Sequence, residues 1–177
     1  MAQQSFVTVT NLTPIANQTA LVATTEEVLI PTAYSGIAAN ESVPGKIWRL
    51  TIGGIMSWAA TGTLALTPRV GLVIGGITLG ISVVAVTTPG ATTNHAFTAV
   101  FHLVCRTIGL PGANSTYIGT GYFLSSGIGT LGTGTVQSMG GTSATADASI
   151  ATGIWMGKTL TVAGTMTPMY SIMESLT

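Results

Sequence analysis

Strict alternation of side chains along one long segment is the feature that most constrains this fold. In NHAFTAVFHLVCRTIG (residues 94–109), every second residue is apolar: Phe97, Ala99, Phe101, Leu103 and Cys105. The intervening row is mixed: Thr98, Val100, His102, Val104 and Arg106. A period of two places successive side chains on opposite faces of a strand. The segment is therefore predicted to be one long strand with a buried face.

The same alternation recurs in KIWRLTIG (46–53), GTLALTPRVGLVI (62–74) and KTLTVAGTMT (158–167). The rows predicted to face the core are Trp48, Leu50 and Ile52, then Leu64, Leu66, Val70 and Leu72, then Leu160, Val162 and Met166. Residues 142–154 come closest to a helical period, but their Thr and Gly favour a loop. The Gly-rich residues 125–141 are interpreted as either a long loop or a loose strand pair. About seven to nine short strands separated by turn signals predict an all-β sandwich or barrel.

The chain has 177 residues and few charges. Asp, Glu, Lys and Arg make up 6%, against roughly 25% in a typical soluble domain. Five basic and five acidic side chains cancel, so no electrostatic footprint for nucleic acid or anionic lipid is expected. Neutral surfaces tend to associate. We expect one domain at residues 28–177, preceded by an extended N-terminal arm at residues 1–27.

The apolar run at residues 70–86 raises the question of a membrane span, because no charge occurs in it. The run is shorter than the roughly 20 residues that a spanning helix needs. It is interpreted as two short strands broken at Gly75-Gly76, and no membrane partner is expected. The N-terminus lacks the basic and apolar regions of a secretory signal. With the single Cys105, these features predict synthesis in a reducing cytoplasm without secretion.

Two glycine-rich motifs resemble nucleotide-binding loops but lack their context. GIGTLG (127–132) is not followed by a helix-forming segment, and GIWMGKT (153–159) runs into an alternating strand pattern. Both phosphate-binding mechanisms need a helix N-terminus at that point. In the second motif, Lys158 is interpreted as a solvated charge at a strand edge.

Metal binding and catalysis are not expected either. His102 and Cys105 lie three residues apart, so a strand directs them to opposite faces. The chain has no second Cys, no carboxylate cluster and no nucleophile-elbow pattern. We predict no cofactor, no metal, no catalytic residue and no enzymatic activity.

The mixed rows of the predicted strands carry Arg49, Arg69 and Arg106. Arginine is enriched at the centres of protein interfaces. His102, between Val100 and Val104 on its row, is a further candidate interface residue. The alternative is that the arginines form ordinary cross-strand pairs with Thr and with backbone carbonyls.

The segment KIWRLTIGGIMSWAATGTLALTPRVG (46–71), the long strand at 94–109 and the closing strand GKTLTVAGTMT resemble a type of tailed-bacteriophage structural protein. The residues that match its pattern are Trp48, Arg49, Gly62, Leu64, Leu66, Arg69 and Gly71. The resemblance covers about residues 28–177. It implies a single jelly-roll β-sandwich that trimerises and decorates a capsid.

The resemblance therefore leads us to expect a virion protein of the decoration or cement type. Its partners would be two further copies of itself and the major capsid protein, with the N-terminal arm lying across a neighbouring subunit. Two alternatives are a shell-forming capsid subunit and a tail or fibre component that binds host glycans. The glycan-binding alternative predicts exposed aromatic residues, with Tyr117, Tyr122 and Trp155 as candidates.

Overall fold

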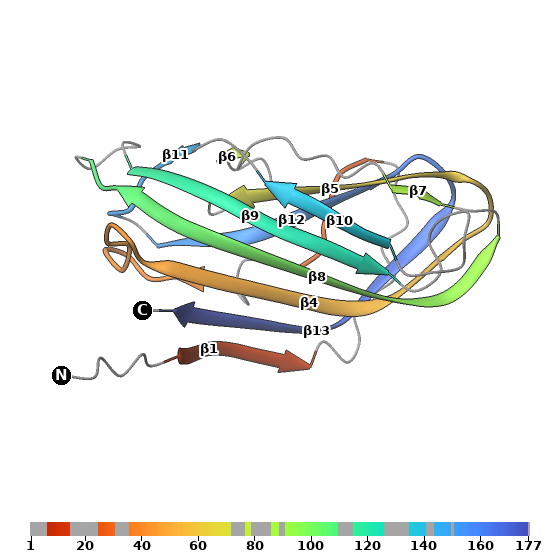
Figure 1. Ribbon diagram of the computed structural model, residues 1–177, viewed down its shortest axis with the longest axis horizontal. Helices are drawn as coiled ribbons and strands as arrows, with labels where there is room; N and C mark the ends of the chain where they lie inside the picture. Colours follow the sequence, from red (N-terminus) through yellow and green to blue (C-terminus); the bar gives the residue numbers. More distant parts are fainter. Residues whose placement is uncertain are drawn as a thin grey trace.

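The computed structural model describes residues 7–14, 25–30, 36–71, 77–78, 86–88, 91–109, 115–125, 135–140, 144–149 and 151–176. Within these ranges, it describes no side chains for residues 7–14, 77–78, 86–88, 135–140, 144–145 and 155. The described residues form two antiparallel β-sheets and no helix. The chain is thus an all-β sandwich, and Figure 1 shows its long strands running side by side.

The larger sheet has seven strands. Six follow the order β1 (Val7–Pro14), β13 (Gly164–Leu176), β4 (Ile47–Trp58), β8 (Thr92–Thr107), β9 (Ser115–Ser125) and β10 (Thr135–Gly140). The seventh, β11 (Ala144–Ala146), pairs with β9. The predicted long strand is confirmed as β8, at the centre of this sheet.

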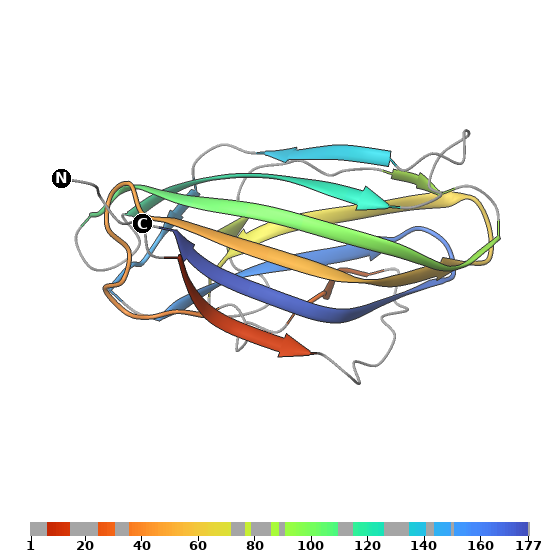
Figure 2. The same ribbon diagram turned by 60° about the horizontal axis from the view of Figure 1, so that its bottom comes forward.

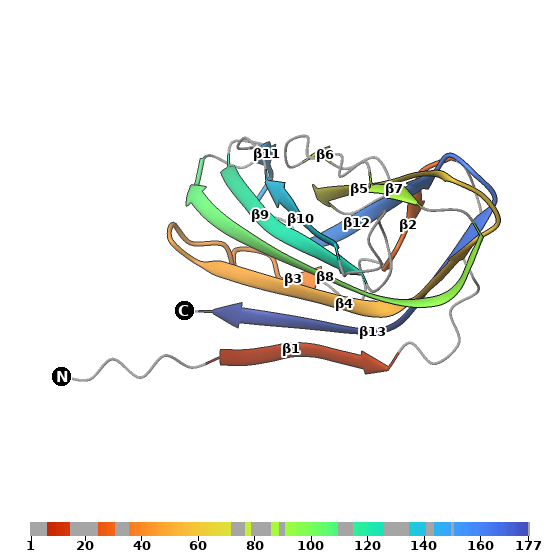
Figure 3. The same cartoon turned by 45° about the vertical axis from the view of Figure 1, so that its right-hand side comes forward.

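The smaller sheet has six strands and contains the second pair of long strands. Its path is β2 (Glu27–Val28), β12 (Thr152–Leu160), β5 (Gly62–Val70) and β6 (Ile77–Thr78). Two short strands pair beside this path: β3 (Gly36–Ile37) with β12, and β7 (Val86–Thr88) with β5. Figure 3 separates the two layers, with β5 and β12 lying across from β4 and β8.

The core lies between the two sheets and is built from the predicted apolar rows. Trp48, Leu50, Ile52, Leu64, Leu66, Val70, Phe97, Ala99, Phe101, Leu103, Cys105, Leu160 and Met166 are all buried in one cluster. Val162 is half-buried against that cluster, and Leu72 lies outside the described residues. Phe97 and Phe123 stack across β8 and β9 with ring centroids 6.0 Å apart. The period of two therefore identified these buried residues correctly. The prediction of one strand at residues 158–167 was wrong, because residues 161–163 bend between the end of β12 in the smaller sheet and the start of β13 in the larger sheet.

The segment predicted as an N-terminal arm contains β1 and the first residue of β2, and these two strands belong to different sheets. β1 pairs with β13 along one edge of the larger sheet, as Figure 2 shows. Residues 27 and 28 form β2, which pairs with β12 in the smaller sheet. The boundary between an arm and a domain at residue 27 stays a prediction.

Three other segments can be compared with their predictions. The prediction of a loop at residues 142–154 was wrong in part, because this segment includes β11 and the start of β12. Of the Gly-rich segment, residues 135–140 pair with β9, and GIGTLG lies outside the described residues. Most of the apolar run at 70–86 lies outside them as well. Within the described ranges, no helix is long and apolar enough to cross a membrane.

Candidate functional site

Ion pairs neutralise most of the few charges of this chain. Lys46 pairs with Glu41 at 3.0 Å, Arg49 with Glu174 at 2.6 Å, and Arg69 with Glu26 at 2.6 Å. Lys158 pairs with Glu27. Within the described part of the chain, no ion pair includes Arg106, which is exposed near the end of β8. The exposed charge is therefore even lower than the composition indicates.

The outer face of the larger sheet carries one charged row that crosses three strands. The strand register places Glu174 of β13 opposite Arg49 of β4, and Arg49 opposite His102 of β8. The Arg49 Nε donates a hydrogen bond of 2.6 Å to Glu174 Oε2. This charged row brings together two of the predicted interface residues, Arg49 and His102.

The charged row changes the titration of its own members. The hydrogen bond from Arg49 holds the pKa of Glu174 below its usual value, against the effect of burial. Burial lowers the pKa of the His102 imidazole, the positive charge of Arg49 lowers it further, and Glu174 opposes both effects. At neutral pH the row therefore consists of a compensated ion pair beside a neutral imidazole.

Three largely uncharged cross-strand rows surround the charged row. On one side lie Leu176, Ile47, Val104 and Ile118. On the other side lie first Ile172, Thr51, Val100 and Tyr122, and then Tyr170, Gly53, Thr98 and Leu124. Ile118 is 40% exposed, and Tyr122 and Tyr170 are each 39% exposed. We call these four rows together the outer face of the larger sheet.

Glycine shapes this surface at one position. A side chain on Gly53 would collide with the ring of Tyr170, so the absence of a Cβ lets that ring lie against the sheet. The phenol of Tyr122 lies near enough to Arg49 to influence the pKa of the guanidinium. The outer face thus carries two exposed tyrosines in adjacent rows, Tyr122 on β9 and Tyr170 on β13.

Arg69 is not part of the outer face, because it lies on β5 in the smaller sheet. Its guanidinium donates two hydrogen bonds to the Glu26 carboxylate, from Nε at 2.8 Å and from the terminal nitrogen at 2.6 Å. Arg49 and Arg106 lie on strands of the larger sheet, so the three candidate arginines do not share one face. An interface role for each arginine stays a prediction.

Lys158 corrects a second prediction. It is fully buried instead of lying solvated at a strand edge. Lys158 occupies the inward row of β12, between the buried Met156 and Leu160, and it pairs with Glu27 of β2. The adjacent carboxylates of Glu26 and Glu27 therefore attach β2 to the smaller sheet through two different basic residues.

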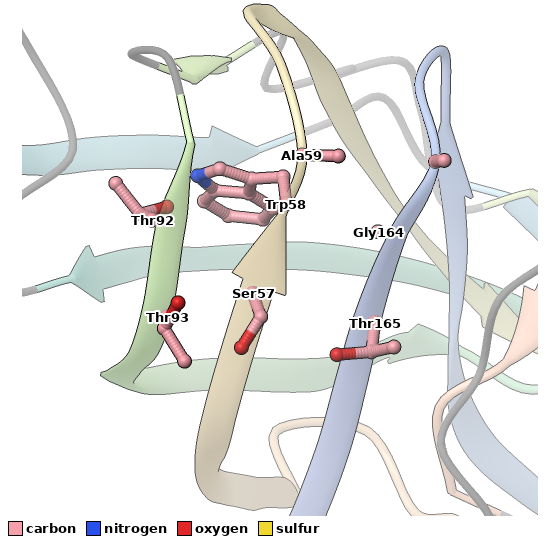
Figure 4. Close-up of a pocket in the computed structure, with 8 residues that line it drawn as sticks. Ser57, Trp58, Ala59, Thr92, Thr93, Gly164 and Thr165 are labelled. Carbon is pink, nitrogen blue, oxygen red and sulfur yellow. The ribbon is translucent and has the colours of Figure 1, made fainter.

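A separate hollow of about 440 Å³ lies where β4 ends and where β8 and β13 begin. It is lined by Ser57, Trp58, Ala59, Thr92, Thr93, Ala163, Gly164 and Thr165, and Figure 4 shows the indole nitrogen turned toward Thr92. The Trp58 Nε1 and the Thr92 Oγ1 are buried and have no hydrogen-bond partner among the described residues. None of the lining side chains is acidic or basic, so this hollow offers no group for acid–base chemistry.

Other predicted residues have these positions. Cys105 is buried, and burial raises the pKa of its thiol. Tyr117, one of the exposed aromatic residues that the glycan-binding alternative requires, is instead buried, and its hydroxyl donates a hydrogen bond of 2.9 Å to Ser42. The side chain of Trp155 lies outside the described residues. Among the described residues, no three His, Cys, Asp or Glu side chains lie close enough to hold a metal ion.

The sequence analysis did not identify Glu174 and Tyr170 as members of this surface. Both belong to the mixed row of β13, which alternation could have placed on an outward face. Their neighbours depend on the pairing of β13 with β4, which no local pattern specifies. No protein-family model, curated protein or solved structure matches the chain.

Proposed function

We propose that this chain is a structural virion protein of the decoration or cement type. It associates as a trimer, binds the outside of an assembled phage capsid and stabilises that capsid. The protein is made in the host cytoplasm and acts in the virion. It would stabilise the capsid by mass action, because a protein that binds assembled capsomers but not free ones shifts the equilibrium toward assembly.

The outer face of the larger sheet is the observation that carries the proposal. Its two charged residues neutralise each other, and Ile118, Tyr122 and Tyr170 are exposed on it. When one face of an antiparallel sheet is exposed to water, that face commonly carries polar side chains. Contiguous exposed apolar surface, and aromatic residues in particular, mark sites of protein association.

The strand order supports the jelly-roll part of the proposal. In the larger sheet, β13, β4, β8 and β9 are neighbours in that order. This spatial order is the 4-1-2-3 order of a Greek key, the unit from which jelly rolls are built. The connection from β4 to β8 differs from a simple Greek key, because it runs through β5, β6 and β7 of the smaller sheet instead of a hairpin. The chain also passes between the sheets from β4 to β5, from β7 to β8 and from β12 to β13.

The first experiment is the solution mass of the purified chain by light scattering after size exclusion. A trimer of the 17.9 kDa chain has a mass of about 54 kDa. Ile118→Lys adds a charge to the outer face and should shift the protein toward monomer. Ala60→Lys, at an exposed position in the β4–β5 turn, is the matched control and should leave the mass unchanged. A wild-type monomer at every concentration would contradict the trimer.

Capsid binding is tested next by sedimentation with tailed-phage capsids prepared without their decoration protein. Bound protein should pellet with the capsids and raise the temperature at which they break open. Two other results would support different functions. Closed particles formed by the chain alone would indicate a shell subunit, and a melting temperature raised by free sugars would indicate a glycan-binding tail component.

A further inference from the structure

A second, smaller hollow lies at the end of the sandwich where β8 finishes and β11 leads toward β12. Its volume is about 260 Å³, and its walls come from the loop after β3, the residues after β8 and the turn after β11. These segments lie together at one end of the molecule in Figure 1. The hollow is thus built from three parts of the chain that are far apart in sequence.

The lining of this hollow combines one carboxylate with exposed apolar side chains. Asp147 is the charged residue of the lining, and its Oδ1 accepts hydrogen bonds from the Ser149 amide at 2.9 Å and from the Ser149 hydroxyl at 2.6 Å. These bonds hold the carboxylate in place. Val43 is 51% exposed and Ile108 is 46% exposed. A carboxylate beside apolar surface suits a cation on a long aliphatic stem, as in arginine.

Arg106 lies at the same end of the molecule, two residues before Ile108. It is exposed, and no ion pair within the described part of the chain includes it. The register of β8 with β9 shifts between Cys105 and Thr107, which makes Arg106 the extra residue of a β-bulge. A bulge redirects the side chain that it carries. Arg106 is therefore a projecting cation in a chain whose other basic residues are all in ion pairs.

We propose that Arg106 of one copy inserts into this hollow on a second copy of the chain. Its guanidinium pairs with the Asp147 carboxylate, and its methylene groups pack against Val43 and Ile108. The inference rests on the self-association in the proposed function and adds the contact that orients neighbouring copies. The arginine and the hollow lie at the same end of the molecule but consist of different residues. Arg106 of each copy can therefore enter the hollow of the next copy around a rotation axis.

The test measures subunit dissociation by light scattering or sedimentation over a dilution series. Arg106→Gln removes the cation, and Asp147→Asn removes the negative charge but keeps the oxygen that Ser149 requires. Each variant should raise the dissociation constant about tenfold or more. The dissociation constant of the double variant should be no higher than that of either single variant, because both substitutions remove the same contact. Ala60→Glu, at an exposed position in the β4–β5 turn, changes the net charge by the same amount as Arg106→Gln and is the control. Folding of every variant is checked by circular dichroism.

The outcomes separate this contact from the proposed function. If the wild type is an oligomer and both single variants dissociate no more readily than it does, the contact is wrong while the proposed function stands. If the effects of the two substitutions add fully in the double variant, the two residues do not contact each other, and the contact is again wrong. A wild type that stays monomeric at all concentrations overturns both proposals.

Discussion

Replacing Glu27 by Gln should destabilise the protein more than replacing its buried partner Lys158 by Met. Lys158 is fully buried in the inward row of β12, opposite the buried Leu66 of β5. Glu27→Gln preserves size but leaves the ammonium group in the core without its counter-charge. Breaking a buried pair in this way costs about 3–5 kcal/mol. The Glu27 side chain is 26% exposed, so we expect the lower end, about 3 kcal/mol.

Lys158→Met should behave differently, because it removes the charge that is costly to bury. Apolar replacements of buried ion pairs are often neutral or stabilising, and Glu27, being a quarter exposed, can still reach water. We expect a change in the free energy of unfolding of less than about 1 kcal/mol. The double variant Glu27→Gln/Lys158→Met should be about as stable as Lys158→Met alone.

The assay is urea unfolding followed by circular dichroism, with all variants at one protein concentration. For a chain of this length, about 3 kcal/mol corresponds to a fall of roughly 6–12 °C in melting temperature. The reasoning is refuted if Lys158→Met is at least as destabilising as Glu27→Gln. It is also refuted if the double variant stays as unstable as Glu27→Gln, because the desolvated ammonium would then not be the cause.

Two further predictions concern the larger sheet. An NMR titration of His102 should give a pKa below 6.5, which Arg49→Gln raises and Glu174→Gln lowers further; a midpoint unchanged in both variants would contradict the charged row. Because this pKa is lowered, the contribution of His102 to stability is complete above about pH 6.5 and declines as the pH falls toward the folded-state value. Gly53→Ala and Gly54→Ala should differ in their effect on thermal stability. The new methyl group meets a partly exposed tyrosine ring at position 53, but it meets a backbone carbonyl of β13 at position 54. The melting temperature should change little for Gly53→Ala and fall by several degrees for Gly54→Ala. Equal falls would contradict the view that the tyrosine ring can move away from the methyl group whereas the β13 backbone cannot.

Local pattern was sufficient for the buried faces of the long strands β4, β5 and β8. In β8, the alternation of Phe97, Phe101 and Cys105 with a mixed row of apolar and polar residues identified the row that packs into the core. The reason is that a strand directs successive side chains to opposite faces, whatever lies beside it. Short strands without alternation, such as β11, were not predicted, because pairing with β9 and not local preference holds them in place.

The partners of the charged residues depended on the tertiary structure. Arg49 and Glu174 are 125 residues apart, and Lys158 and Glu27 are 131 residues apart. The alternation in the sequence places Arg49 on an outward row, but the residues beside it are determined by the register of three strands. Lys158 shows the limit most clearly: its place on an inward row was visible in the alternation, yet a buried lysine is stable only when a carboxylate from another strand reaches it. The sequence by itself determined which side of each long strand is buried, and the folded sheets decided which charges meet.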